Sequence, residues 1–405
     1  MAWTMLSKPV LDRALVRSGA TAPLALALSG GGDSVALLHA LVDAVGPARI
    51  LALVVDHALR QGSDVDAHRA QSFALALGVK SEVLQLGWPN GPKRSQEGAR
   101  VGRHRALADA ARRAGARVLL LAHTSDDQAE TLMMRAAAGS TWRGLAAMAA
   151  WAPSPVWPQG RGLMIARPLL DVRRERLREY LRAHSAVWID DPANADEAFQ
   201  RVRTRARLAA FEARGLAPSR LVRVAARLRR LADRVDREAL GLIERAVRFE
   251  NEEARLTLAA WRAPRPVAER SLSVLLMAVS GAEAAPESAA LMRLAGEIGA
   301  PEFRGATLGG ARVKPAGQGH LLLLRDVGAL AGRADGGAPL APWPLPMAAT
   351  SIWDGRLALR APRAGMSLLW EGAPVLAEGD RRLPLALASP EWLLGERVRH
   401  MLSRD

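Results

Sequence analysis

A glycine-rich segment near the start of the chain has the residue types of a phosphate-binding turn. It lies between an apolar run at 24–28 and an apolar helical pattern that begins at residue 35, and it comprises Ser29, Gly30, Gly31, Gly32, Asp33 and Ser34. Glycines allow backbone N–H groups to turn toward an anion at the start of a helix, where the helix dipole also favours negative charge. A carboxylate beside phosphates is repulsive unless a cation lies between them, so we predict that Asp33 binds Mg²⁺. The alternative is a tight strand-to-helix turn with a capping Ser or Asp.

A second group of polar residues follows a later apolar run at 117–122. His123 comes directly after that run, and Asp127 and Glu130 are three residues apart, so a helix that starts here presents both carboxylates on one face. Two neighbouring carboxylates can hold Mg²⁺ or receive a ligand ammonium group. The alternative is that they only cap the helix, because Asp and Glu are favoured in first helical turns.

The elements that must position these residues alternate between strands and helices. Apolar runs predict strands at 24–28, 50–55 and 117–122, and longer patterns predict helices at 34–45, 64–78, 97–115 and 126–138. This alternation predicts an α/β domain with a parallel sheet covered by helices. Ser29, Asp56 with His57, and His123 each follow a predicted strand end, so we expect them to line one crevice.

Composition limits the classes of protein that this chain can belong to. The chain has 405 residues and no cysteine, which excludes disulfides, thiolate metal sites and a catalytic thiol. It has no uninterrupted apolar stretch long enough for a membrane span, so we expect a cytoplasmic protein. The net charge is +15, and Arg supplies 52 of the 56 basic residues. Residues 161–240 hold 19 Arg against 11 acidic residues, which favours a nucleic-acid partner, although a GC-rich genome would also enrich Arg.

The rest of the chain divides into further segments. A Pro- and Trp-containing stretch at 151–158 predicts a mobile loop, and helices are expected at 171–184, 200–214 and 218–247. A small helical unit to about 298 and short strands at 303–313 and 319–325 follow. We therefore expect a catalytic domain at 1–215, a helical domain at 216–330, a Pro- and Gly-rich linker at 331–349 and a β-rich region at 350–405.

Several motifs together resemble those of a known family. The segment 29–34 matches S-G-G-x-D-S, the signature of the PP-loop ATP pyrophosphatases, and differs from dinucleotide-binding and Walker loops. Over roughly residues 24–210 the chain resembles the tRNA(Ile)-lysidine synthetases. The further matching motifs are D-H-x-L-R at 56–60, an approximate E-x-x-A-R at 97–100, H-x-x-D-D-Q-x-E-T at 123–131, R-P-L-L at 167–170, W-x-x-D-P-x-N at 188–194 and R-x-R-x-R at 201–205.

The resemblance implies a fold and a reaction. The fold is an adenine nucleotide alpha hydrolase-like PP-loop domain, followed by a helical middle domain and a small α+β region. The reaction uses ATP and Mg²⁺ to adenylate cytidine 34 of the CAU-anticodon tRNA(Ile), after which free L-lysine displaces AMP. A homodimer is compatible with the sequence. The alternatives are a PP-loop ligase that acts on a small molecule and a catalytically idle tRNA-binding relative.

The resemblance also implies roles for individual residues. The cofactor-binding residues would be 29–34 with Asp56 and His57, and Asp33 and Asp127 would hold the metal. The tRNA-binding residues would be Arg201, Arg203 and Arg205, and the helical domain at 216–330 would also bind tRNA. The catalytic residues would be Asp33, Arg100, His123, Asp127 and Glu130.

Overall fold

The computed structural model describes most of the chain as two compact units. The described residues are 5–58, 62–87, 96–190, 200–215, 217–331, 342–347, 349–371 and 373–404. The units divide between Asp233 and Arg234, inside the long helix α9 (Pro218–Ala246). The expected domain boundaries at 215, 330 and 349 remain predictions.

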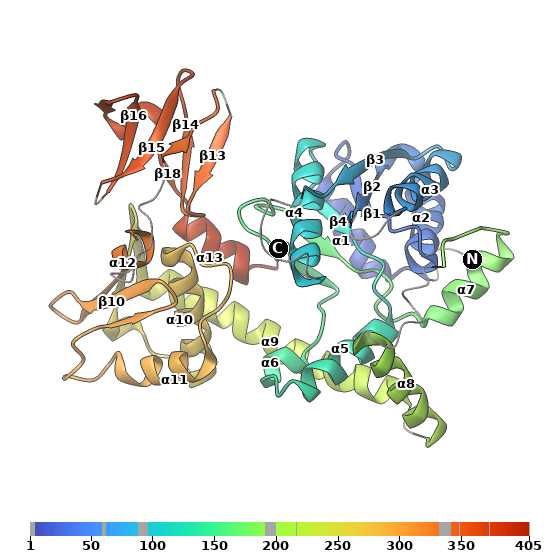
Figure 1. Ribbon diagram of the computed structural model, residues 1–405. Coiled ribbons are helices and arrows are strands. Elements are labelled where there is room, and N and C mark those ends of the chain that lie inside the picture. Colours follow the sequence, from blue (N-terminus) through green and yellow to red (C-terminus); the bar gives the residue numbers. More distant parts are fainter. Residues whose placement is uncertain are drawn as a thin grey trace. The chain divides into compact units, whose positions relative to one another are not determined.

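The first unit is built on a six-stranded sheet with the order β3-β2-β1-β4-β6-β5 (Figure 1). Its strands are β1 (Leu24–Ala27), β2 (Ile50–Asp56), β3 (Lys80–Gln85), β4 (Val118–Leu120), β5 (Trp151–Pro153) and β6 (Met164–Ala166). All pairings are parallel except that of β5 with β6. The chain moves outward from β1 through β2 to β3 and then returns to place β4 on the other side of β1. The carboxyl ends of β1 and β4 therefore border the point at which the strand order reverses, where open α/β sheets bind ligands.

Helices cover both faces of this sheet. The helices of this unit are α1 (Lys8–Ser18), α2 (Gly32–Val45), α3 (Ser63–Ala76), α4 (Gln96–Arg113), α5 (Ser125–Ala137), α6 (Trp142–Leu145), α7 (Arg174–Ala183) and α8 (Gln200–Ala213). Successive residues of β1 point to opposite faces, so Leu24 and Leu26 pack with α1, α2, α3 and α7, whereas Ala25 packs with α4. Because both faces are buried, β1 is apolar throughout, as the sequence predicts.

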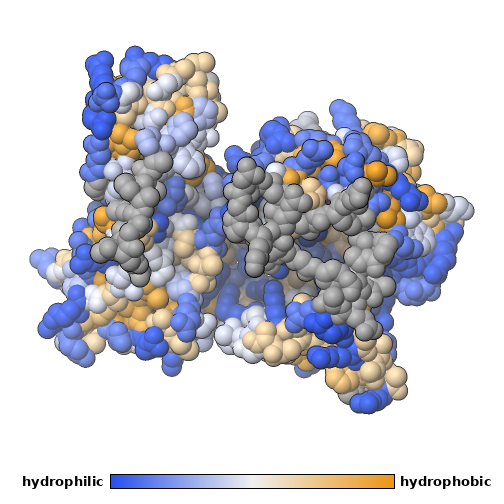
Figure 2. Space-filling view, in the orientation of Figure 1, coloured by the Kyte–Doolittle hydropathy of each residue, from blue (hydrophilic) through white to orange (hydrophobic). Residues whose placement is uncertain are grey.

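Helix α7 packs against α2 through a narrow apolar stripe. Leu177 and Leu181 are fully buried and Tyr180 is 7% exposed, and all three belong to the core on that face of the sheet. Hydrophilic residues cover the outer side of the helix (Figure 2). Arg174 and Arg178 flank the buried stripe, so α7 can direct them toward the start of α2.

The second unit contains three antiparallel sheets. Their strand orders are β7-β8-β11-β10-β9, β12-β15-β16-β17 and β13-β14-β18. The strands are β7 (Val247–Glu250), β8 (Glu253–Thr257), β9 (Ala306–Leu308), β10 (Ala311–Pro315), β11 (His320–Arg325), β12 (Trp343–Pro344), β13 (Thr350–Trp353), β14 (Leu357–Arg360), β15 (Met366–Trp370), β16 (Pro374–Glu378), β17 (Arg381–Leu383) and β18 (Glu391–Trp392). The helices are α10 (Arg265–Ser280), α11 (Ser288–Glu297), α12 (Val327–Ala331) and α13 (Leu394–Leu402).

The expected fold class is confirmed, with corrections at particular elements. The loop expected at 151–158 is wrong over Trp151–Pro153, which forms the antiparallel edge strand β5. Trp343–Pro344, inside the expected linker, pairs with β15 as strand β12. Among the described residues, none of the helices combines the length and apolar character needed to cross a bilayer.

Candidate active site

The glycine-rich segment forms a tight turn between β1 and α2. Gly31 is the N-cap of α2, and Ser34 Oγ donates to Gly31 O (2.9 Å) and accepts from Ser29 N (3.2 Å). Gly30 has φ +79°, and a Cβ there would lie 2.7 Å from the Ile189 side chain. Ile189 N also donates to Gly30 O (2.9 Å). The turn therefore requires glycine at position 30 and leaves backbone N–H groups at the start of α2 directed away from the sheet.

Arg178 of α7 fills the space beside Gly32. A Cβ on Gly32 would lie 1.2 Å from Arg178 Nη1. That nitrogen is buried and has no hydrogen-bond partner among the described residues. The guanidinium also lies 5.0 Å from the ring of Trp188. A cation at a helix N-terminus opposes the helix dipole, so this position favours an anionic ligand between the two.

His123 follows β4 and is neutral in the folded protein. Burial and the charge of Arg167 lower the pKa of His123 to about 3. Arg167 Nε donates to His123 Nδ1 (3.2 Å), and its Nη1 donates to Ala149 O (2.8 Å). His123 therefore acts as a neutral imidazole with Nδ1 as an acceptor, and it does not supply a positive charge.

Asp56 is the last residue of β2 and His57 follows it, so the strand ends one residue later than the sequence predicts. The two residues have different surroundings, and Asp56, contrary to our expectation, does not line the crevice. Asp56 Oδ1 accepts from Ala58 N (2.9 Å) and Ser63 Oγ (2.6 Å) and so ties the strand end to the start of α3. His57 lines the crevice together with Ser29 and Asp33. Asp56 shapes the turn, and His57 is the residue of the pair that faces the cavity.

The two carboxylates of α5 form an ionic cluster. Thr124 is the N-cap of α5 and makes a capping box with Asp127. One oxygen of Asp127 therefore has the helix-capping role that the sequence analysis describes as the alternative. Asp127 Oδ1 accepts from Arg174 Nη2 (2.9 Å) and Arg201 Nη2 (3.3 Å). Glu130 is 1% exposed. Its Oε1 accepts from Arg174 Nη1 (3.4 Å) and Arg205 Nε (2.8 Å), and its Oε2 from Arg201 Nε (3.0 Å).

Arg174 extends this cluster to the glycine-rich turn. Its Nε donates to Asp33 Oδ2 (3.0 Å), so one guanidinium contacts three carboxylates. Burial opposes the charge of Arg174, but Asp127, Asp33 and Glu130 outweigh it and raise the pKa of Arg174. Burial likewise disfavours the charged form of Asp127, but Arg174 and Arg201 lower the pKa of that carboxyl. At Asp33 burial dominates and raises the pKa, and Asp33 Oδ1 is buried without a partner among the described residues.

Two cavities adjoin these groups. The smaller, about 190 Å³, lies at the ends of β1, β2 and β4 and is lined by Ser29, Asp33 and Ser34. The larger, about 880 Å³, is lined by arginines of α4, α8 and the β6 end. Arg103 and His123 line both cavities. The crevice at the strand ends and the larger, arginine-lined cavity therefore meet at two side chains.

The predicted site residues fall into three groups. Most of them line the crevice or belong to the ionic cluster, and their roles remain predictions. Arg100 is exposed on α4 and lines the larger cavity only, and Arg203 is exposed on α8. Leu59, Arg60 and the motif residues Asp191–Asn194 lie outside the described residues. No group of three or more His, Asp or Glu side chains in the described part of the chain could by itself hold a metal ion.

Sequence reasoning missed Arg103, Arg174 and Arg178. The last two are four residues apart, and their positions beside the apolar stripe of Leu177 and Leu181 were the available signal. Arg103 was hidden among the many arginines of the chain, and only the fold shows that it reaches both cavities.

Comparisons with known proteins identify the family of this chain. A PP-loop domain model matches residues 10–211. Among solved structures, the U34-tRNA thiolase of Methanococcus maripaludis has a TM-score of 0.45 at 16% identity, over 55% of this chain and 78% of that one. The tRNA(Ile)-lysidine synthase of Hyphomonas neptunium is 41% identical over 76% of this chain and 83% of its own. That of Caulobacter vibrioides is 38% identical over 95% of this chain and 85% of its own. The chain belongs to the tRNA(Ile)-lysidine synthase family.

Proposed function

We propose that this protein joins free L-lysine to C2 of cytidine 34 in the CAU-anticodon tRNA(Ile), with consumption of ATP. The product, lysidine, changes the codon that the tRNA reads from AUG to AUA. The observation that carries the proposal is the meeting of a PP-loop, a pair of buried carboxylates and an arginine-lined cavity in one site. Membership of the tRNA(Ile)-lysidine synthase family supports the same reaction.

The first step forms a bond between the C2 oxygen of the cytidine and the α-phosphorus of ATP, and pyrophosphate leaves. The turn at 29–34 would bind the phosphates through backbone N–H groups at the start of α2. The second step forms a bond between the lysine ε-nitrogen and C2, the C2–oxygen bond breaks, and AMP leaves. The attacking amine must be neutral, so a carboxylate of the α5 pair would accept its proton.

Of the two carboxylates expected to hold Mg²⁺, Asp33 suits this role as it stands and Asp127 suits it only after a change of partners. Asp33 Oδ1 is buried and unpartnered among the described residues, which suits an ion that also binds ATP phosphates. Both oxygens of Asp127 already accept hydrogen bonds, so Asp127 would have to release an arginine before it could act as a ligand. When bound, Mg²⁺ would neutralise charge on the departing pyrophosphate.

Lysine and tRNA would bind on either side of His123. The buried carboxylates Asp127 and Glu130 suit the lysine ammonium group, and the 880 Å³ cavity suits a nucleotide of the anticodon loop with its phosphates. Arg201 and Arg205 line that cavity while they hold the carboxylates, so their contact with tRNA remains a prediction, as does that of Arg203.

The proposed function is tested by the products formed from ATP. Purified protein with ATP, Mg²⁺, lysine and CAU-anticodon tRNA(Ile) should release AMP and pyrophosphate in proportion to the tRNA, and omission of tRNA should abolish AMP release. AMP release that needs a small acceptor and no tRNA would instead support a small-molecule PP-loop ligase. No AMP under any condition would indicate an idle tRNA-binding relative.

A further inference from the structure

Arg174 is bound at once to groups of two different proposed sites. Its Nε contacts Asp33 (3.0 Å), which belongs to the phosphate-binding turn, and its two terminal nitrogens contact Asp127 (2.9 Å) and Glu130 (3.4 Å). The last two residues are the proposed acceptors of the lysine ammonium group. Arg174 therefore occupies the space between the ATP phosphates and the lysine amine that the proposed function requires.

The carboxylate pair has little capacity left for another cation. All four oxygens of Asp127 and Glu130 already accept hydrogen bonds, three of them from arginines and one from Thr124. A lysine ammonium group that enters this cluster must displace a guanidinium, because an added cation among the arginines would be repelled. A displaced arginine beside the phosphate-binding turn gains a strong anionic partner when ATP phosphates are bound there.

Of the three arginines that hold the carboxylate pair, Arg174 is the one whose displacement costs the least free energy when ATP is present. Arg201 and Arg205 come from α8, and within the described part of the chain they form ion pairs with Asp127 and Glu130 alone. Arg174 already extends to Asp33, next to the start of α2. One turn along α7, Arg178 lies against Gly32 with a buried nitrogen that has no hydrogen-bond partner within the described ranges. Helix α7 thus directs two guanidinium groups toward the place where phosphates would bind.

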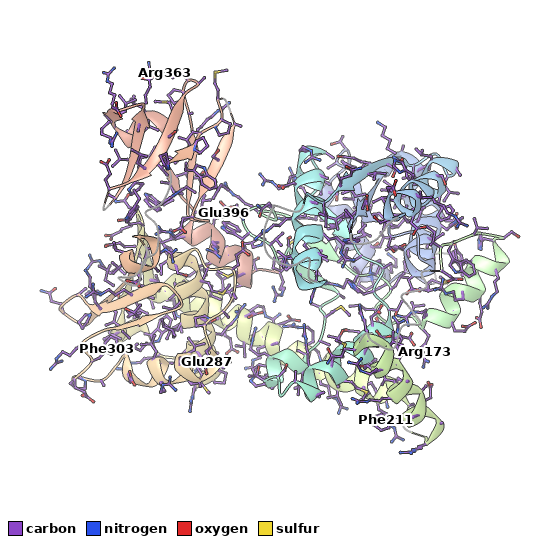
Figure 3. All side chains as sticks on the ribbon, in the orientation of Figure 1. Arg173, Phe211, Glu287, Phe303, Arg363 and Glu396 are labelled. Carbon is purple, nitrogen blue, oxygen red and sulfur yellow. The ribbon has the colours of Figure 1, made fainter. Side chains whose placement is uncertain are left out.

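The base of α7 is fixed, so the guanidinium can move without the helix. Arg173, labelled in Figure 3, contacts Asp126 of α5 (3.2 Å) and Glu212 of α8 (3.3 Å). Arg174 N donates to Asp126 Oδ2 (2.8 Å). The backbone of residue 174 is therefore tied to α5 while its side chain, about a quarter exposed, can exchange partners.

We propose that Arg174 couples ATP binding to lysine binding. Without ATP it holds Asp127 and Glu130 and blocks the ammonium site. When ATP binds, the guanidinium turns to the phosphates and releases both carboxylates, so lysine binds to the ATP-loaded protein. This proposal rests on the proposed function and adds an order of binding to it. Lysine binds only after ATP, the nucleotide that activates cytidine, has bound.

The test measures lysine affinity with and without a nucleotide that cannot react. Equilibrium dialysis with labelled lysine is performed on the full chain alone and with Mg²⁺ and the α,β-methylene analogue of ATP. Wild-type protein should bind lysine on the order of tenfold more tightly with the analogue. The Arg174→Gln variant should bind lysine equally well in both conditions, at about the affinity of the analogue-loaded wild type.

Two further variants separate coupling from folding. Arg182→Gln removes an exposed ion pair with Glu175 on the same helix and should keep the wild-type coupling. Arg174→Lys keeps the charge that the buried carboxylates need for stability, but a single ammonium group cannot contact all three carboxylates. The coupling, which is the ratio of the lysine affinities with and without the analogue, should therefore fall below about threefold.

Three results would overturn the proposal. Equal lysine binding by the wild type with and without the analogue would remove the coupling and leave the proposed function intact. Full coupling in both Arg174 variants would assign the effect to another residue. No lysine binding by the wild type in either condition would contradict the lysine site of the proposed function and, with it, the coupling.

Discussion

At the scale of single residues, Asp33 has the most direct link to the proposed chemistry. One oxygen is held by Arg174 and the other is buried without a partner among the described residues. Removal of the negative charge in Asp33→Asn should lower tRNA-dependent AMP release at least about 100-fold, because Mg²⁺, which would neutralise the departing pyrophosphate, would lose a protein ligand. Binding of tRNA should change less than about twofold.

Asp43→Asn provides a matched control for Asp33→Asn. Asp43 lies on the same helix, accepts from Tyr180 and is exposed, so AMP release by this variant should stay near the wild-type rate. Wild-type turnover by Asp33→Asn, measured from AMP formed per minute, would remove Asp33 from the mechanism.

The buried side chain of His104 should make the free energy of unfolding depend on pH. It is 8% exposed, and burial together with Arg103 and Arg100 lowers its pKa to about 3. The unfolded chain takes up this proton near pH 6.5 and the folded chain does not, so the free energy of unfolding falls as pH decreases from about 6.5, by up to about 1.4 kcal/mol per pH unit. His104→Gln should flatten this slope between pH 6.5 and 5 in urea denaturation.

The control for His104→Gln is His68→Gln, at an exposed position on α3. This variant should keep the wild-type slope. An unchanged slope in His104→Gln would show that the folded protein accepts a proton at His104 near the ordinary pKa of histidine.

At the scale of elements, the turn between β1 and α2 depends on Gly30. Gly30 and Gly46 both have φ +79°, but a Cβ at Gly30 would meet Ile189 and Ala70 below 3 Å, whereas a Cβ at Gly46 would meet nothing within 4 Å. Gly46→Ala should therefore cost only the backbone strain at φ +79°, ψ 154°, about 1–3 kcal/mol. Gly30→Ala should cost about 1–3 kcal/mol more, since two packed groups must shift. Thermal unfolding compares the two, and equal losses would contradict the tight turn.

Helix α8 presents its arginines in two directions. Arg201 and Arg205 are four residues apart and contact Glu130, whereas Arg203 points to another side of the helix and is exposed. Arg203→Ala should weaken tRNA binding and reduce the slope of log affinity against log salt by about one. Arg182→Ala, on α7, should leave that slope unchanged. A wild-type slope in Arg203→Ala would mean that this arginine makes no phosphate contact.

At the scale of the whole molecule, the sequence predicts the order of elements well where patterns are strong. The long helices and the apolar strands β1, β2 and β4 follow the predicted ranges closely. Strand β3 was missed because it is an edge strand with a polar sequence, and β5 and β6 have only three residues each. The fold, and not local pattern, determines these strands.

The candidate site, like the fold, was predictable from the sequence only where local patterns are strong. The motifs identified the carboxylates and the glycine-rich turn, because those residues adjoin strand ends. They did not reveal that Arg174 bridges Asp33 to Asp127 and Glu130, since the contact joins residues more than forty positions apart and depends on how α7 packs against α2 and α5. Likewise, Arg201 and Arg205 were expected to face tRNA, and the packing of α8 on α5 directs them to Glu130.

The reaction itself is tested most directly by the transfer of labelled lysine to tRNA. With ATP and Mg²⁺, the protein should incorporate label into CAU-anticodon tRNA(Ile) and not into tRNA(Met), which has the same anticodon sequence. Absence of label in tRNA(Ile), with ATP still converted to AMP in the presence of another acceptor, would contradict the proposed substrate and leave only the PP-loop chemistry.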